Sequence, residues 1–333
     1  MNKTLTALLV SSALLSAPGL ASASSVKLYG LVDLNVGSYK ESGGQRENDV
    51  ASGRMRTSYW GLSGEDKISD NLTSFFTLEA FFRADDGSSG RFDGDVMYAR
   101  NAVVGLKGDK WGMLRVGRMA ASMYINTVAF NPLADSFGFS PAVRNHYQGG
   151  IGRISGDTGW SNSINYTTPS VGGFSLTLHH QFKTGDQRAN QSAMLSYKGE
   201  RFAIGVVGQK VRSVFNQGSE ESWQVGTSYD LDWMKLFAQY TESREKHSTT
   251  LNNNTKDRIY QAGVSVPVGK DLVMFSYSQA RTTGAYTQRR EFLSLGYSHR
   301  LSARTDLYST VMADKKTSHS IAPTVAVGIR HAF

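Results

Sequence analysis

The sequence contains no cysteine. In an exported chain this absence excludes the disulfide frameworks that stabilise small secreted domains, and it also excludes thiol catalysis and cysteine metal ligands. Proline is scarce, with 6 residues among 333. After residue 23, no apolar run reaches the roughly 20 residues that a membrane-spanning helix requires. A small disulfide-rich domain and a helical membrane protein are therefore both excluded.

Catalytic and metal-binding motifs are missing as well. The sequence has no H-E-x-x-H, no G-x-S-x-G and no phosphate-binding glycine loop. The acidic residues within 85–95 lack EF-hand spacing. His179 and His180 would point to opposite faces of a strand, which is unsuitable for a shared metal ion. We expect no catalytic residue, no metal site and no cofactor.

The first residues have the pattern of a secretory signal peptide. Lys3 is followed by an apolar stretch from Leu5 to Leu15 and then by Ala21-Ser22-Ala23, which has the A-x-A form of a cleavage site. Cleavage after Ala23 would leave residues 24–333 as one exported domain. The formal net charge of the full chain is +8, and its cations are scattered. This charge favours anionic solutes modestly, and we expect no nucleic-acid partner because the protein is exported.

Apolar and polar residues alternate over segments of about ten residues, separated by clusters of Gly, Asn, Asp and Ser. Residues 174–183 and 324–333 are two clear examples. A period of two places apolar residues on one face of a strand and polar residues on the other. The pattern fits a soluble sandwich, whose apolar faces pack together, and equally a membrane barrel, whose apolar face meets lipid.

Aromatic positions and connector lengths favour the barrel. Aromatic residues of the apolar faces fall at both ends of the expected strands, as at two membrane interfaces. Long polar connectors such as Lys40–Gly53 and Ala84–Asp95 alternate with short ones such as Gly199–Glu200. The sequence thus predicts an all-β fold: a transmembrane antiparallel β-barrel of about 16 strands. One stretch without alternation, residues 119–156, is predicted to be a long loop, which in a wide barrel can fold inward and narrow the lumen.

Two other functions stay open at this point. One is a secreted soluble β-sheet protein that binds carbohydrate. The other is a plugged barrel that acts as an adhesin or an enzyme. An enzyme would need a nucleophile beside a base, such as a Ser–His pair, and no motif supports one.

Several motifs, in this order along the chain, resemble those of the general-diffusion porins of Gram-negative outer membranes, especially the trimeric type of Neisseria, Bordetella and Burkholderia-like bacteria. The resemblance runs from Ser24 to Phe333, and its most specific pieces are Val26–Asp33, Trp60–Asp66, Leu114–Arg118, Tyr166–Ser170 and Val327–Phe333. It implies a sixteen-stranded barrel in the outer membrane that passes small hydrophilic solutes and ions. It also implies acidic residues on an inward third loop facing basic residues on the wall.

The resemblance places a wall arginine at Arg118, and we assign the loop acid to Asp135. Alternation turns further charged residues toward the lumen, namely Lys27, Asp33, Glu79 and Arg330, and Arg144 and Arg153 lie on or near the loop. Many relatives carry arginine where this chain has Tyr59, and Arg54 or Arg56 could substitute for it. The excess of positive charge suggests a mild anion preference.

The resemblance also implies partners. It predicts a homotrimer in which the second outer loop, Ala84–Asp95, latches onto a neighbouring subunit. Contacts with outer-membrane lipid and lipopolysaccharide are expected. The aromatic residue Phe333 matches the signal that the outer-membrane barrel assembly machinery reads.

Overall fold

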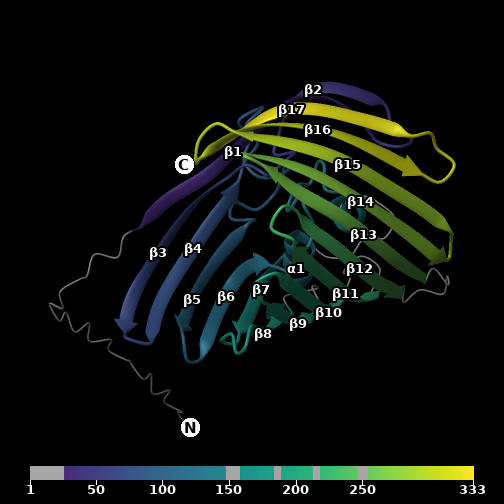
Figure 1. The fold of residues 1–333 in the computed structure, drawn as a ribbon. Coiled ribbons are helices and arrows are strands. Elements are labelled where there is room, and N and C mark those ends of the chain that lie inside the picture. The colour runs from purple at the N-terminus through teal and green to yellow at the C-terminus, as the bar shows by residue number, and fades with distance from the viewer. Residues whose placement is uncertain (1–25, 148–157, 184–188, 213–217, 247–253) are drawn as a thin grey trace, which may run out of the picture.

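The computed structural model describes residues 26–147, 158–183, 189–212, 218–246 and 254–333. In these ranges the chain forms one closed antiparallel sheet with two short helices inside it (Figure 1). The wall consists of β1 (Lys27–Lys40), β2 (Arg46–Ser52), β3 (Tyr59–Ser69), β4 (Leu72–Phe81), β5 (Asn101–Gly108), β6 (Gly112–Ala120), β7 (Gly159–Thr167), β8 (Phe174–Gln181), β9 (Asn190–Lys198), β10 (Phe202–Arg212), β11 (Ser219–Asp230), β12 (Lys235–Lys246), β13 (Thr255–Val268), β14 (Asp271–Gly284), β15 (Gln288–Arg300), β16 (Thr305–Lys316) and β17 (Ala322–Ala332).

The barrel closes where the first strand meets the last. β1 pairs with β17 in a register that runs from Leu31 opposite Ala332 to Ser38 opposite Val325. From β3 to β17, each strand pairs with the strand that follows it in sequence. Closure pairs the first strand with the last and so removes the two open edges that they would otherwise present, which hydrocarbon would not tolerate.

One position in the wall is shared by two short strands. β2 pairs with the half of β1 from Leu34 to Lys40, and β3 pairs with the half from Lys27 to Leu31 and with β4. The seventeen segments described therefore fill sixteen positions, which confirms the predicted strand count. The expectation that residues 40–53 are a loop was wrong for Arg46–Ser52, which extend the wall beside β1.

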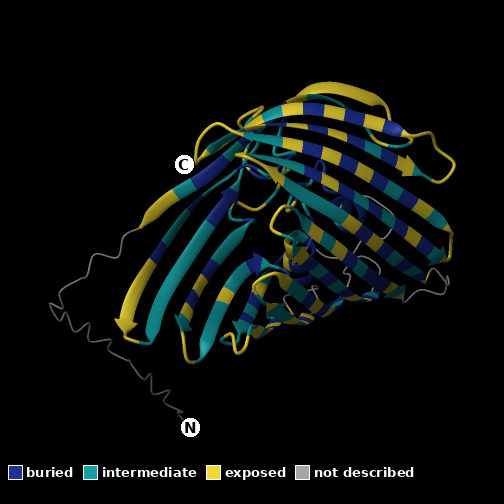
Figure 2. Cartoon of the chain, viewed as in Figure 1, coloured by how far each residue is buried: buried dark blue, intermediate teal, exposed yellow. Residues whose placement is uncertain are grey.

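Alternation sets the two faces of the wall, and exposed and buried residues form stripes along the strands (Figure 2). On β16, for example, Leu307 and Val311 are exposed on the outer face, whereas Tyr308 and Met312 are buried on the inner face. The outer face is mainly apolar in the middle of the strands. The inner face carries most of the buried polar side chains. This is the arrangement of a barrel whose outer surface meets lipid.

The stretch predicted to lack strands contains two helices, α1 (Ser122–Ala129) and α2 (Pro141–Tyr147). An irregular loop was expected there. Within the described ranges, neither helix has the length and hydropathy that crossing a bilayer requires. The predicted leader, residues 1–23, and the end of the predicted third loop, residues 148–156, lie outside the described residues.

Candidate functional site

The segment from residue 121 to 147, which we call the inward loop, lies against the inner wall. α1 contacts β9, β10 and β11, and α2 contacts β13, β14 and β15. Asn126 Nδ2 donates to Gln224 Oε1 at 2.7 Å, and Asn145 Nδ2 donates to Ser278 Oγ at 2.9 Å. Because both acceptors are buried on the inner face of the wall, these bonds hold the loop inside the barrel.

Local sequence explains the shape of the loop. Ser140 precedes α2, and its Oγ accepts a hydrogen bond from the Val143 amide at 3.3 Å, while Pro141 occupies the first helical position. Both are favoured residues at a helix start. Asn131 connects the end of α1 to the turn that follows it, because its Nδ2 donates to the carbonyls of Thr127 and Ala134 at 2.7 and 3.0 Å.

An apolar cluster anchors the middle of the loop. Phe139 is fully buried and belongs to a cluster with Leu133 of the loop and Tyr39, Met55 and Tyr308 of the wall side. The ring centroids of Phe139 and Tyr308 are 6.4 Å apart in an edge-to-face arrangement. Burial of a phenylalanine side chain contributes about 1.5–3 kcal/mol. This cluster therefore fixes the part of the loop that contains the acidic residue Asp135.

That acid, Asp135, meets an arginine from the wall. Arg56 Nε lies 3.1 Å from Asp135 Oδ2, and the two side chains are 40% and 14% exposed. Partial exposure means that the pair remains in contact with water inside the lumen. The Arg54 backbone also binds the loop, because its carbonyl accepts from the Gly138 amide and from Ser136 Oγ, each at 2.8 Å.

Asp33 explains why Arg56 points to the loop. Residues 53–58 leave the wall between β2 and β3, and the fully buried Asp33 carboxylate accepts the Met55 and Arg56 amides, both at 2.8 Å. Tyr308 Oη donates to the other carboxylate oxygen at 2.6 Å. Asp33 thus holds the bend that carries Arg56, and its carboxylate is occupied by these donors.

A second arginine pair lies on the neighbouring strands. Arg100 Nε lies 3.1 Å from Glu79 Oε2, and Tyr29 Oη donates to Glu79 Oε1 at 2.8 Å. The Asn101 side-chain amide also donates to Glu79. The Arg100 guanidinium lies over the Tyr59 ring, 4.2 Å from its centroid, which is a cation–π distance. Tyr59 therefore supports an arginine that directly precedes β5.

Tyr124 of α1 lies between these groups. Burial raises the pKa of Tyr124 above its ordinary value, and the charge of Asp135 adds to this rise, whereas the charges of Arg100, Arg56 and Arg91 oppose it. Groups that act on one phenol in this way share one region of the lumen. Of these arginines, Arg56 pairs with Asp135, Arg100 pairs with Glu79 and Arg91 pairs with Asp95.

A further charged cluster fixes α2 to the wall. Arg144 Nη2 lies 2.8 Å from Glu41 Oε1, and Arg290 Nη2 lies 2.7 Å from Asp314 Oδ2. Both guanidinium groups lie over the Phe292 ring, at 5.0 and 4.7 Å from its centroid. Arg144 is buried. These contacts give Arg144 a structural position between α2 and β15.

The remaining predicted residues are spread over the barrel. Arg330 Nη2 forms an ion pair with Asp306 Oδ2 at 2.7 Å, and Lys27 is exposed at the first position of β1. Phe333 exchanges two backbone hydrogen bonds with Gly30, each 3.1 Å long. Arg153 lies outside the described residues. The Arg330 guanidinium also lies over the Tyr308 ring, 5.8 Å from its centroid, beside the residue that donates to Asp33.

Arg118 has a different environment from the one predicted. Its guanidinium donates to the carbonyls of Ala99 and Gly159, at 2.7 and 3.2 Å, and to Ser161 Oγ at 2.9 Å. It follows Val116, which is exposed on the outer face, by two positions. Arg56 rather than Arg118 contacts Asp135. The pairing of Arg100 with Glu79 was also missed, although Arg100 directly precedes the strand opposite Glu79.

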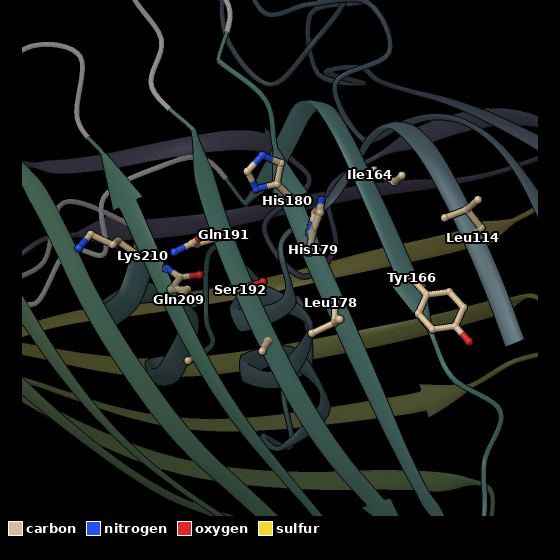
Figure 3. Close-up of a pocket in the computed structure, with 12 residues that line it drawn as sticks. Leu114, Ile164, Tyr166, Leu178, His179, His180, Gln191, Ser192, Gln209 and Lys210 are labelled. Atoms are coloured by element: carbon tan, nitrogen blue, oxygen red, sulfur yellow. The ribbon is translucent and has the colours of Figure 1, made fainter.

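The barrel also has a groove of about 580 Å³ over β6 to β10 (Figure 3). Ala193 and Gly208, which stand opposite each other in the register, leave a depression beside Leu178, and Tyr166 lies farther along the same row. Figure 3 shows Leu178 and Tyr166 on one side of the strands and the inward helices behind them. Because Leu178 belongs to the exposed outer face, this groove opens toward lipid and not toward the lumen.

Comparison with known proteins gives concordant matches. The sequence model of the family described as Gram-negative porin matches residues 5–319. The chain is 27% identical to an outer membrane porin protein of Bordetella pertussis, over 93% of this chain and 94% of that protein. It is also 27% identical to outer membrane porin protein 32 of Delftia acidovorans, over 98% and 99%. The fold is similar to the solved anion-selective porin from Comamonas acidovorans, with a TM-score of 0.79, 24% identity, and coverage of 93% of this chain and 100% of that one.

Proposed function

Because the chain belongs to the Gram-negative porin family and is an outer-membrane channel, we propose that it passes small hydrophilic solutes and ions by passive diffusion past the inward loop. The observation that carries this proposal is the Arg56–Asp135 pair, which spans from the wall to the loop. Family membership also sets aside the soluble carbohydrate-binding alternative. We propose in addition that the barrel catalyses no reaction.

Selection at the narrowest point depends on width and on the local electric field. The carboxylate of Asp135 on the loop side and the guanidinium groups of Arg56 and Arg100 on the wall side create a field across the lumen. Such a field orients water and polar solutes, and low-dielectric walls strengthen it. In this proposal, Arg118 does not belong to the constriction, and Arg100 takes the place assigned to it.

We propose a mild anion preference. Among the described residues, the Arg54 guanidinium has no ion-pair partner and lies over the Tyr39 ring, 4.7 Å from its centroid. The backbone of Arg54 contacts the inward loop, so this cation lies at the same level as Asp135. An arginine without a carboxylate partner attracts anions into the lumen. The solved Comamonas protein is named an anion-selective porin, which accords with this proposal.

Planar-bilayer recording of the purified protein in a KCl gradient tests the proposal. We expect large, stable conductance steps and a reversal potential displaced toward chloride. A cation-selective reversal potential would refute the anion preference. A folded barrel without conductance would refute diffusion through the lumen.

The assembly is also a proposal. We propose a homotrimer in which the second outer loop contacts a neighbour, because Phe92 on that loop and Val96 and Met97 directly after it are exposed apolar residues. The loop is held in shape by ion pairs, such as Arg91 Nε to Asp95 Oδ2 at 2.8 Å. Conductance steps that close in groups of three would support the trimer. We further propose that residues 1–23 direct export, that Phe333 is read by the barrel assembly machinery and that lipopolysaccharide surrounds the barrel.

A further inference from the structure

Three arginines stand in a row on the outer surface of the wall. Arg258 of β13 stands opposite Arg281 of β14, and Arg281 stands opposite Arg289 of β15. Of the residues next to them in sequence, Asp257, Ile259, Ala280, Thr282 and Arg290 are buried on the inner face. Because side chains alternate along a strand, this row, which we call the arginine row, points away from the lumen.

Directly opposed like charges are unfavourable in a sheet, because their Cβ atoms lie about 5 Å apart. The wall offsets this repulsion only in part. Arg289 Nη2 lies 2.6 Å from Glu291 Oε1, and Arg258 Nε lies 3.5 Å from Glu242 Oε2. Among the described residues, the Arg281 guanidinium has no ion-pair partner, so the centre of the row is uncompensated.

Glu242 is shared with two other cations. Arg244 Nη2 lies 2.9 Å from Glu242 Oε1, and Lys256 Nζ lies 2.8 Å from Glu242 Oε2. One carboxylate therefore serves three cations, including Arg258. The outer surface of β12 to β15 at this level carries a local excess of positive charge.

Aromatic side chains mark the level of the arginine row. Tyr260 is 46% exposed on the outer face of β13, and it stacks with Tyr240, which stacks with Trp223, at centroid distances of 5.0 and 5.2 Å. Tyr and Trp on the outer face of a barrel lie at the membrane interface. Arg258 lies two residues beyond Tyr260, about 7 Å farther along the strand. The arginine row is thus at the level of the lipid head groups.

We propose that the arginine row binds the phosphate-bearing head group of an outer-leaflet lipid that has several acyl chains. Guanidinium groups donate paired hydrogen bonds that match phosphate oxygens, and a phosphate beside Arg281 would offset the repulsion along the row. The acyl chains would lie on the apolar wall below, where Phe275, Leu293 and Leu295 are exposed. The inference requires the barrel to be in a membrane, but it does not require the lumen to conduct.

The test compares binding of bisphosphorylated lipid A to the detergent-purified wild type and to variants, with the dephosphorylated lipid as a second ligand. We expect Arg281→Gln to weaken binding of the bisphosphorylated lipid about tenfold, and Arg258→Gln with Arg281→Gln to weaken it further. Arg304→Gln is the matched control, because Arg304 is exposed in the turn between β15 and β16 at the opposite end of the wall.

Each outcome decides the proposal. Equal affinity of wild type and Arg281→Gln, or equal affinity for both lipids, would overturn it. Displacement of the lipid by inorganic phosphate at millimolar concentration would show a site for free phosphate, which also overturns it. Bilayer conductance of every variant should equal that of the wild type, because the row faces away from the lumen. If lipid binding is unchanged in the variants and conductance is normal, the lipid site is therefore refuted but the channel function is not.

Discussion

Removal of the loop carboxylate should make the channel more anion-selective. In Asp135→Asn the side chain keeps its size but loses the charge that faces Arg56 across 3.1 Å. Arg56 then joins Arg54 as a cation without a carboxylate partner. A permeating anion is attracted more strongly at this level, and a cation is repelled.

The size of the effect follows from Coulomb's law. An ion passing about 5 Å from the carboxylate in a water-filled lumen interacts with it by about 0.8 kcal/mol. Screening at physiological salt, where the Debye length is about 8 Å, reduces this to about 0.4 kcal/mol. Because the charge acts oppositely on the two ions, the ratio of chloride to potassium permeability should rise about fourfold.

The assay is the reversal potential across a planar bilayer in a KCl gradient. Asp70→Asn is the matched control, since it removes the same charge from a fully exposed side chain in the turn between β3 and β4. The control should leave the permeability ratio unchanged. An Asp135→Asn channel with an unchanged ratio, or with one shifted toward potassium, would show that Asp135 does not act on permeating ions.

Other perturbations have expected outcomes of their own. Asp33→Ala removes the acceptor of two backbone amides, so the free energy of unfolding in urea should fall by at least about 2 kcal/mol, with noisier open-channel current. Phe139→Ala leaves a cavity between loop and wall, and it should lower that free energy by about 3–5 kcal/mol in the same titration. Burial lowers the pKa of His146 from 6.5 to about 4, so the unfolded chain binds more protons within that window. The free energy of unfolding should therefore fall by up to about 3 kcal/mol between pH 6.5 and 4, a slope that His146→Gln should remove. Phe92→Ser should reduce the trimer fraction in size-exclusion chromatography with light scattering, because it removes an exposed apolar contact from the second outer loop.

The strands could be predicted because their period of two is a local property of the sequence. The segment 324–333, for example, pairs with β1 on one side and with β16 on the other, and its side chains alternate between the two faces as the sequence indicates. β2 could not be predicted in this way, since Arg46–Ser52 is mostly polar and is followed by a bend whose amides Asp33 of β1 accepts. A buried side chain from a different strand determines this bend.

The site could be predicted only in part, because charged residues are placed by contacts between distant segments. Asp135 lies on the inward loop as expected, but its partner comes from a bend 79 residues earlier in the chain. Arg118 follows Leu114 and Val116 at even spacing, and a register irregularity between Gly117 and Met119 lies beside it. At a bulge the regular alternation of side chains is interrupted, so alternation alone does not predict the face on which a side chain lies.

The pairing of β1 with β17 determines when the barrel can form. Leu31 and Ala332 are neighbours in the sheet although almost the whole chain separates them. Such a contact requires closure of a very long loop, which is slow, and until then both strands present open hydrogen-bonding edges. Until the last strand has emerged into the periplasm, the chain therefore cannot pair β1 with β17. During this interval the nascent protein depends on other molecules to cover the unpaired edges of these two strands. Export of the chain and closure of the barrel are therefore separate steps.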